Sequence, residues 1–330
     1  MNRIAILGAG AWGTALAISL ARRGGHEIML WSHSPVLAEH LKETGKNLMY
    51  LPGCTLPMGV VVTADLAAAI SEADIVLCVT PSQHLRGVLR QIAPLLTREQ
   101  IIVSATKGLE ETSMLRMSQV ISSLTDNACG VLSGPSFAAE VAAGIPTAIV
   151  AAAAIPAVAL TMQREFSSPT LRLYTNDDVA GVEFGGSLKN VIALAAGVVH
   201  GLDLGYNSAA ALVTRGIAEI TRLAVACGGR RQTLAGLSGL GDLVLTCTGS
   251  LSRNRMVGIE LGKGRALPEI LAGLNGKVAE GIRSTTAALG LAARYEVEMP
   301  ITEQMDAILH QGKSPKEAIR ELMARPGRDE

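Results

Sequence analysis

The chain has 330 residues, a formal net charge of zero, 48% hydrophobic residues and only 18% charged residues. This composition excludes an intrinsically disordered chain, and the balanced charge indicates neither a nucleic-acid partner nor an anionic membrane surface. The length predicts two domains with a large buried core.

The first part of the chain alternates short β-rich runs with helical segments. Strands are predicted at residues 3–7, 26–31, 60–62, 75–79, 101–105, 130–133, 147–152 and 171–174, and helices at residues 14–23, 36–41, 66–70, 85–96 and 114–124. Alternating βαβ units of this length predict a parallel, doubly wound sheet with helices on both faces.

A glycine-rich loop follows the first predicted strand. Gly8, Gly10 and Gly13 stand in the order Gly-Ala-Gly-Ala-Trp-Gly between a strand and a helix, which is the setting of a dinucleotide-binding fingerprint. Gly8 would allow the tight turn, Gly10 the close approach of a pyrophosphate, and Gly13 close packing of the helix on the sheet. The alternative is a structural turn without a ligand, but the position near the N-terminus favours a Rossmann-type cofactor site.

The end of the second predicted strand bears on which nicotinamide cofactor binds. An NAD-selective site places an acidic residue there, whereas this chain has Ser32, His33 and Ser34. These residues tolerate a 2′-phosphate, so the sequence favours NADP or dual use. A plain surface histidine is the alternative for His33.

Polar groups follow two later strands, where ligands sit in doubly wound folds. Lys107 comes after strand 101–105, and Ser136 follows strand 130–133 as the expected N-cap of a helix. The alternatives are a solvated loop lysine and an ordinary helix cap.

After about Asp178 the pattern becomes helical. Helices are predicted at residues 182–199, 208–227, 252–261, 268–271, 284–295, 302–310 and 315–323. We therefore expect a dinucleotide-binding domain at residues 1–180 and an all-α, substrate-binding domain at residues 181–330.

Lys189 is expected to lie near the start of an otherwise apolar helix at residues 188–199, within the helical stretch predicted at residues 182–199. The helix dipole and burial would both lower its pKa toward the range of a general acid or base. The alternative is a lysine whose stem is buried while its head reaches solvent.

A second polar segment contains Asp242 in an expected glycine-rich turn. A polar loop then leads to Ser252, Arg253 and Asn254 in the first turn of a helix, where Arg and Asn suit a phosphate. The alternative is Ser252 as a simple N-cap with Arg253 in solvent.

Other features of the sequence bear on the cellular compartment and on membrane insertion. Five scattered cysteines without CxxC spacing or histidine neighbours predict neither disulfides nor a metal site, and fit a reducing cytoplasm. The apolar run at residues 4–7 is too short for a signal peptide. The apolar stretch at residues 145–160 contains Pro146 and Pro156 and falls short of a bilayer span, so no membrane insertion is expected.

Taken in order, these segments resemble the bacterial-type NAD(P)-dependent glycerol-3-phosphate dehydrogenases over nearly the whole chain. The resemblance rests on GAGAWGTALA, ATKGLE, SGPSFAAE, GGSLKNVIALAAG, TRGIAEITRL, GLSGLGDLVLTCTGSLSRNR, EGIRST and VEMPIT. It implies reversible reduction of dihydroxyacetone phosphate to sn-glycerol 3-phosphate, which feeds glycerophospholipid synthesis. It also implies a fold similar to that of 6-phosphogluconate dehydrogenase, and a homodimer.

The resemblance implies roles for individual residues. Lys189 looks like the proton donor and acceptor, and Lys107 like a residue shared by cofactor and substrate. The matching substrate residues are Gly134, Ser136, Asp242, Ser252, Arg253 and Asn254. The matching cofactor residues are Ala11, Trp12, His33, Ala138, Arg253, Val278 and Glu280. Trp12 is a mild departure, because a smaller aromatic or similar residue can stand there, and it bears on cofactor packing.

Two other readings compete with this one. A related dehydrogenase acting on a hydroxy acid or 6-phosphogluconate would share the architecture and a lysine, but the Ser252–Asn254 segment favours the first reading. A cofactor-binding sensor without catalysis would have lost Lys189 or Asp242, and both are present. The cofactor stays open between NADPH and NADH.

Overall fold

The computed structural model describes residues 2–274 and 279–327. The chain folds into two compact units: Met1–Lys107 with Leu115–Glu183, and Gly108–Met114 with Phe184–Glu330. The short segment after Lys107 thus groups with the second unit, although it is flanked in the sequence by the first.

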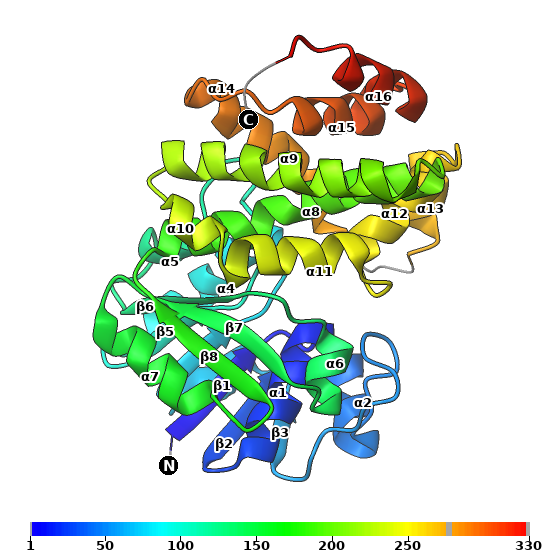
Figure 1. Cartoon of the computed structure of the whole chain (residues 1–330). Coiled ribbons are helices and arrows are strands. Elements are labelled where there is room, and N and C mark those ends of the chain that lie inside the picture. Colours follow the sequence, from blue (N-terminus) through cyan, green and yellow to red (C-terminus); the bar gives the residue numbers. More distant parts are fainter. Residues whose placement is uncertain (1, 275–278, 328–330) are drawn as a thin grey trace. The chain divides into compact units, whose positions relative to one another are not determined.

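The first unit is built on an eight-stranded sheet with the order β3-β2-β1-β4-β5-β6-β7-β8 (Figure 1). The strands are β1 (Asn2–Leu7), β2 (His26–Trp31), β3 (Val60–Thr63), β4 (Ile75–Cys78), β5 (Ile101–Ser104), β6 (Cys129–Ser133), β7 (Thr147–Ala152) and β8 (Leu171–Asn176). All eight predicted strands are present, and the doubly wound architecture is confirmed.

One strand pair departs from the expected parallel sheet. Strand β7 pairs with β6 in the antiparallel sense, whereas the other neighbours are parallel. A parallel connection must cross back over the sheet, usually by a helix. The only helix between these strands is α6 (Ala138–Ala143), whose 6 residues rise only about 9 Å. The chain therefore enters β7 at the end where it left β6.

Helices cover both faces of the sheet. The helices are α1 (Ala11–Arg23), α2 (Pro35–Thr44), α3 (Leu66–Ile70), α4 (Ser82–Ile92), α5 (Met117–Ser122), α6 and α7 (Pro156–Phe166). On β1, Ile4 and Ile6 pack with buried residues of α1, α2, α6 and α7, while Ala5 and Leu7 pack with those of α3, α4 and α5. Burial on both faces explains why central strands such as β4 are continuous apolar runs, whereas the edge strand β8 alternates buried and exposed residues.

Helix α5 is shorter than the predicted helix at residues 114–124. Met114 has a positive φ of 59°, which lies outside the right-handed helical region. It also belongs to the segment that groups with the second unit. The helix starts only after the chain has returned to the first unit.

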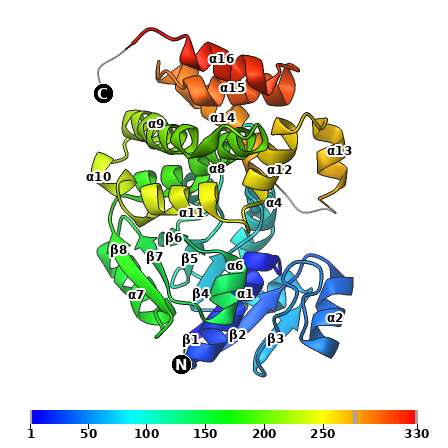
Figure 2. The ribbon, with the colours of Figure 1, turned by 45° about the vertical axis from the view of Figure 1, so that its right-hand side comes forward.

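The second unit is helical in its described part, as predicted (Figure 2). Its helices are α8 (Val179–Gly201), α9 (Gly205–Ala226), α10 (Arg231–Leu234), the π-helical turn η2 (Leu237–Gly241), α11 (Asp242–Thr248), α12 (Arg253–Gly262), α13 (Leu267–Ala272), α14 (Glu280–Arg294), α15 (Pro300–His310) and α16 (Pro315–Met323). The division between the units falls inside α8, after Glu183.

Helix α8 has the length and apolar character of a membrane-spanning segment, with a mean hydropathy of 1.3. Within the described residues, a bent pair made of Arg231–Thr248 and Arg253–Gly262 passes the same test only if it counts as one span. The apolar window of α8 is 100% buried within the protein, as in a core helix.

Candidate functional site

The glycine-rich loop has the geometry that each glycine was expected to provide. Gly8 has a φ of +130°, and a Cβ on it would lie 2.8 Å from the Val79 carbonyl oxygen. A Cβ on Gly13 would lie 1.8 Å from the carbonyl oxygen of Gly8. A Cβ on Gly10 would meet no atom within 4 Å. Gly8 and Gly13 thus serve the turn and the packing, while Gly10 borders open space.

Helix α1 begins directly at this open side of the loop. Its N-cap is Gly10, which has no side chain to occupy the first amides, and Ala11 and Trp12 are its first residues. The indole Nε1 of Trp12 is buried and has no hydrogen-bond partner among the described residues. A helix N-terminus bordered by a glycine cradle binds phosphate groups well. The residues present therefore fit the diphosphate of a dinucleotide.

The turn after β2 uses most of its hydroxyl groups locally. Ser32 Oγ donates to the Ser34 carbonyl at 3.0 Å, and Ser34 Oγ caps α2 by accepting from Leu37 N at 3.3 Å. His33 is exposed, and its ring stands edge-on to Trp31 with centroids 6.0 Å apart. Ser32, His33 and Ser34 were predicted to lie near a 2′-phosphate. The hydroxyl groups of the two serines bond within the turn, so the exposed His33 ring is the side chain best placed to contact that phosphate.

Lys107 lies together with two other predicted site residues at the ends of β5 and β6. Its Nζ donates to the Gly134 carbonyl at 2.8 Å and to Ser136 Oγ at 3.5 Å. The Ser136 hydroxyl donates to the same carbonyl at 2.9 Å. The prediction that Ser136 caps a helix is wrong, because Phe137 is the N-cap of α6 and no side chain caps it. Ser136 faces Lys107 instead.

The remaining predicted cofactor residue of the first unit, Ala138, is the first residue of α6. It packs against the apolar cluster that contains α1. Within this unit, most of the predicted residues therefore form two groups. One consists of the glycine loop and the start of α1, and the other consists of the polar residues around Lys107.

Lys189 is buried, as predicted, with 6% of its surface exposed. The predicted helix at residues 182–199 is confirmed as part of α8, but the expectation that Lys189 lies near the start of a helix is wrong, because α8 begins at Val179. Lys189 therefore lies in the middle of a long helix, where the dipole of the N-terminus has no special influence.

Side chains of α11 hold the Lys189 ammonium. Nζ lies 2.5 Å from Asp242 Oδ1 and 2.9 Å from Thr246 Oγ1. Asp242 is fully buried, with 0% exposed. A buried charge requires such partners, since desolvation otherwise disfavours it. The sequence placed Asp242 and Lys189 in one site, and the structure brings the two into direct contact.

Close backbone contacts explain how Asp242 reaches Lys189. A Cβ on Gly185 of α8 would lie 2.4 Å from the Ser238 carbonyl oxygen, and a Cβ on Gly239 would lie 2.1 Å from that of Leu234. Gly185 lets the π-helical turn pack directly on α8, and Gly239 lets the turn pack closely on Leu234 of α10. The expected glycine-rich turn is thus one turn of π-helix that continues into α11, with Asp242 as the first residue of α11.

Thr246 is a site residue that the sequence analysis missed. It lies one helical turn after Asp242 on α11, and its hydroxyl donates to the Asp242 carbonyl at 2.6 Å. Asp242 and Thr246 are four residues apart, a spacing that places two side chains on the same face of a helix and could have identified Thr246. It went unseen because the segment was expected to be a turn. Nearby, burial raises the pKa of the Cys247 thiol to about 12 and so disfavours its thiolate form.

The start of α12 carries the predicted phosphate-binding residues. Ser252 is its N-cap, accepting from Arg255 N at 3.2 Å. Asn254 Oδ1 accepts from Gly281 N at 3.1 Å. Desolvation lowers the pKa of Arg253, although the residue is exposed as a whole, and the negative charge of Glu280 acts in the opposite sense. Arg253 and Glu280 are therefore close enough to interact, whereas Val278 lies outside the described residues.

Glycines also bring the start of α12 toward the helix that carries Lys189. A Cβ on Gly197 of α8 would lie 2.1 Å from the Arg255 carbonyl oxygen, and one on Gly258 of α12 would lie 2.0 Å from that of Leu194. A Cβ on Gly281 would lie 2.6 Å from the carbonyl oxygen of Asn190. The two helices and the start of α14 thus pack backbone to backbone. This arrangement gathers the polar residues of the second unit.

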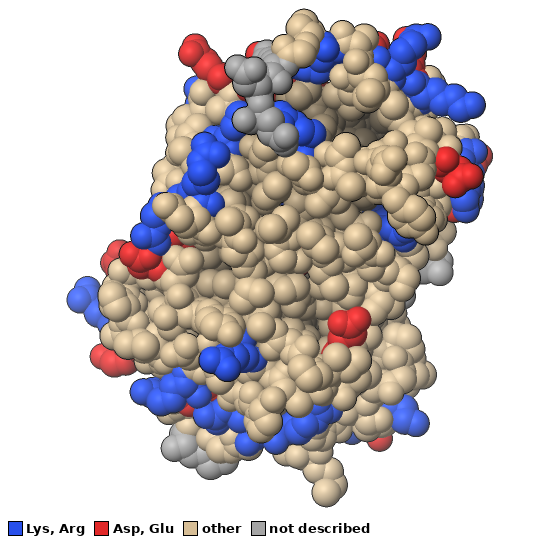
Figure 3. Space-filling model, in the orientation of Figure 1, with Lys and Arg blue, Asp and Glu red and all other residues tan. Residues whose placement is uncertain are grey.

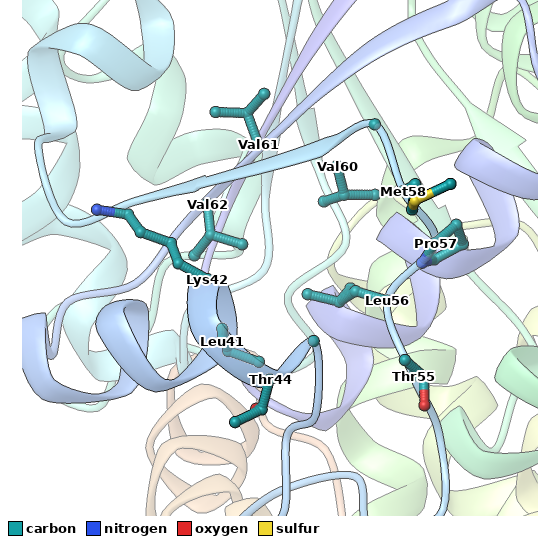
Figure 4. Close-up of a pocket in the computed structure, with 12 residues that line it drawn as sticks. Leu41, Lys42, Thr44, Thr55, Leu56, Pro57, Met58, Val60, Val61 and Val62 are labelled. Atoms are coloured by element: carbon teal, nitrogen blue, oxygen red, sulfur yellow. The ribbon is translucent and has the colours of Figure 1, made fainter.

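A separate cavity lies at the edge of the sheet, between α2, β3 and the connection before β3 (Figure 4). Its volume is about 540 Å³, and it is lined mainly by apolar residues such as Leu41, Leu56 and Val62. None of the predicted site residues lines it. We place the site at the polar groups above, because they carry the chemistry that this cavity lacks.

The charged side chains on the face shown in Figure 3 are scattered. Lysines and arginines lie mainly along its margins with fewer acidic residues among them, and uncharged residues cover most of its centre.

Comparisons with known proteins agree with these observations. Residues 3–159 match the N-terminal and residues 178–320 the C-terminal model of NAD-dependent glycerol-3-phosphate dehydrogenase. The glycerol-3-phosphate dehydrogenase [NAD(P)+] of Acidobacterium capsulatum is 61% identical, with 100% of both chains covered. The crystal structure of glycerol-3-phosphate dehydrogenase from Coxiella burnetii is 40% identical, with a TM-score of 0.94 over 98% of this chain and 99% of that one.

A more distant likeness concerns the fold alone. A D-mandelate dehydrogenase structure matches with a TM-score of 0.64 at 14% identity, over 96% of this chain and 99% of that one.

The two family models together span most of the chain, and the full-length relative from Acidobacterium capsulatum is identical at well over half of its positions. The chain therefore belongs to the NAD-dependent glycerol-3-phosphate dehydrogenase family.

Proposed function

We propose that this protein is an sn-glycerol-3-phosphate dehydrogenase that reduces dihydroxyacetone phosphate reversibly with NADPH or NADH. The observation that carries the proposal is the full-length match, at 61% identity, to a protein named glycerol-3-phosphate dehydrogenase [NAD(P)+]. The buried Lys189–Asp242–Thr246 cluster supports it, because carbonyl reduction needs a proton donor.

Lys189 acts as the general acid in this proposal. When bound, the reduced nicotinamide supplies the hydride that reduces the carbonyl carbon. Lys189 gives a proton from Nζ to the carbonyl oxygen, and takes it back in the reverse direction. Its positive charge also stabilises the negative charge that develops on that oxygen. Asp242 and Thr246 fix the direction of the ammonium group through the bonds at 2.5 and 2.9 Å.

The substrate phosphate is assigned to the start of α12. Arg253 offers a fork of donors that matches phosphate oxygens, and Ser252 and Asn254 flank it at a helix N-terminus. Gly134, Ser136 and Lys107 complete the proposed substrate residues. Lys107 also serves the cofactor, as do Gly8, Gly10, Gly13, Ala11, Trp12, His33, Ala138, Arg253, Val278 and Glu280.

The residues after β2 leave the choice between NADPH and NADH open. No acidic side chain stands at Ser32, His33 or Ser34 to repel a 2′-phosphate. Dual use is therefore the proposal, with the 2′-phosphate of NADPH favoured at His33.

We extend the proposal to organisation and location. Residues 1–180 bind the cofactor and residues 181–330 bind the substrate. The protein acts as a homodimer in the cytoplasm, where its product enters glycerophospholipid synthesis. The scattered cysteines, which form no disulfide, agree with a reducing compartment. Sedimentation of the purified protein tests the dimer.

A substrate assay tests the function. Purified protein should consume NADPH or NADH when dihydroxyacetone phosphate is added, with sn-glycerol 3-phosphate as product. A related dehydrogenase is the second candidate, because the D-mandelate enzyme shares the fold. Inertness toward dihydroxyacetone phosphate, together with turnover of 6-phosphogluconate or a hydroxy acid, would overturn the proposal in favour of that candidate.

A further inference from the structure

A buried asparagine outside the fingerprint contacts the glycine loop. Asn47 lies in the connection between α2 and β3 and is 1% exposed. Its Nδ2 donates to the Ala9 carbonyl at 2.9 Å and to Thr14 Oγ1 at 2.8 Å. Ala9 is inside the glycine loop, and Thr14 follows it on α1, so one side chain joins both ends of the loop.

The connection that carries Asn47 is itself held in place. Lys46 and Thr55 form an antiparallel bridge, and Leu56 N donates to the Gly45 carbonyl at 2.8 Å. The other end of the Asn47 amide is also used, since Oδ1 accepts from Tyr50 N at 3.1 Å. Both ends of the amide therefore have partners, and this fixes the orientation of the side chain.

Holding the Ala9 carbonyl has a consequence for the next amide. The Ala9 carbonyl and the Gly10 N–H belong to one planar trans peptide, so they point in opposite directions. Asn47 occupies the carbonyl side, which directs the Gly10 N–H away from Asn47. Gly10 is also the position where an added Cβ would meet no atom within 4 Å. The amide whose direction Asn47 sets thus belongs to the residue that borders open space.

We propose that Asn47 is a positioning residue for the cofactor: by holding the Ala9 carbonyl, it orients the backbone amide of Gly10 for a bound diphosphate. Asn47 acts through the loop and not by touching the cofactor. The inference rests on the proposed dinucleotide-dependent function. Preorganised donors bind more tightly because the free protein need not order them on binding.

A merely structural role is the competing explanation, and the chain offers a matched control. Gln100 is also a buried amide in the first unit, 5% exposed, and its Nε2 donates to the Ile70 and Ala73 carbonyls at 2.9 and 2.8 Å. Its Oε1 accepts from Thr97 N at 2.9 Å. It has the same number of partners as Asn47, and none of them is in the glycine loop.

The experiment compares Asn47→Ala, Thr14→Val and Gln100→Ala with the unchanged protein. The melting temperature is measured without cofactor, the Kd for NADPH by fluorescence titration, and kcat and KM with dihydroxyacetone phosphate. Asn47→Ala and Gln100→Ala should both lower the melting temperature, because each removes three hydrogen bonds from buried polar groups. Of these two variants, only Asn47→Ala should raise the Kd for NADPH, by about tenfold, the equivalent of one or two hydrogen bonds.

The kinetic pattern separates positioning from general damage. In Asn47→Ala the KM for NADPH should rise with its Kd, while kcat at saturating NADPH and the KM for dihydroxyacetone phosphate should stay near the unchanged protein. Thr14→Val removes one of the two acceptors of Asn47 Nδ2, together with the longer bond, at 3.5 Å, that Thr14 Oγ1 donates to the Ala9 carbonyl. It should raise the Kd by about threefold. If Asn47→Ala does not fold, Thr14→Val decides the question alone.

Two results would overturn the inference. One is a Kd within twofold of the unchanged protein in Asn47→Ala or, where that variant does not fold, in Thr14→Val. The other is an equal loss of affinity in Gln100→Ala. If the unchanged protein itself does not bind NADPH or NADH, the proposed function fails instead, so the two failures are distinguishable.

Discussion

Alanine at Gly10 and at Gly13 should have opposite effects on folding and on cofactor binding. At Gly13 the new Cβ would lie 1.8 Å from the Gly8 carbonyl oxygen, and backbone cannot move aside as a flexible side chain does. Overpacking of this kind typically costs up to about 3 kcal/mol. In a unit of this size, that lowers the melting temperature by about 6–12 °C.

Alanine at Gly10 should leave the fold nearly unchanged. Its φ of −73° and ψ of −174° suit any residue, and the new Cβ would meet no atom within 4 Å. The stability should change by less than about 1 kcal/mol, mainly because alanine is a weaker N-cap than glycine. The methyl group would instead occupy the space that a diphosphate needs, and the Kd for NADPH should rise at least about tenfold, or ~1.4 kcal/mol.

Two assays on each variant decide between these roles. Thermal unfolding without cofactor measures the packing effect, and titration with NADPH measures binding. Gly10→Ala should melt like the unchanged protein and bind weakly, whereas Gly13→Ala should melt early. The reasoning is refuted if Gly10→Ala binds NADPH with unchanged affinity, or if Gly13→Ala melts at the original temperature.

Three further predictions concern the second unit. Lys189→Ala should cut kcat by roughly 10²–10⁴ in steady-state assays while NADPH titration shows retained binding; near-normal turnover would remove Lys189 from the mechanism. Arg253→Ala should mainly raise the KM for dihydroxyacetone phosphate, and an unchanged KM would place the phosphate elsewhere. Burial raises the pKa of Glu219 from 4.5 to about 8, so its contribution to stability is fully present below pH 4.5 and is lost as the pH rises through 8. Melting temperatures measured across this range should fall less steeply in Glu219→Gln, and parallel curves would contradict the assignment.

The glutamine variant is a fair test because it keeps the acceptor that Glu219 provides. Glu219 Oε1 accepts from Ile301 N at 3.0 Å and from Thr302 N at 3.4 Å, at the start of α15. Its Oε2 is buried and has no partner among the described residues. A neutral side chain avoids the cost of a buried charge at this oxygen.

Local patterns in the sequence predicted most elements of the first unit. The runs that became the central strands, such as β4, are continuously apolar because parallel strands are buried on both faces. The glycine loop was also readable, since the spacing of Gly8, Gly10 and Gly13 reflects steric needs within a few residues of chain. The close contact of Gly13 with Gly8 and the open space at Gly10 follow from that local geometry.

Other features depend on contacts between distant segments. The antiparallel pairing of β7 depends on how far a short α6 can carry the chain. Ser136 was expected to cap α6, but its hydroxyl bonds to the Gly134 carbonyl beside Lys107. A serine before a helix has several local partners of similar strength, so the choice among them is made by the surrounding structure.

The sequence by itself determined the residue types of this protein's chemistry: a glycine cradle, a lysine, an aspartate and an arginine near a helix start. Only the tertiary structure decided that Lys189 lies in the middle of α8 and that its ammonium meets both Asp242 and Thr246. Periodicity and composition describe neighbours along the chain. The ion pair depends on a π-helical turn that packs on Gly185, and that contact between distant segments exists only once the helices have packed.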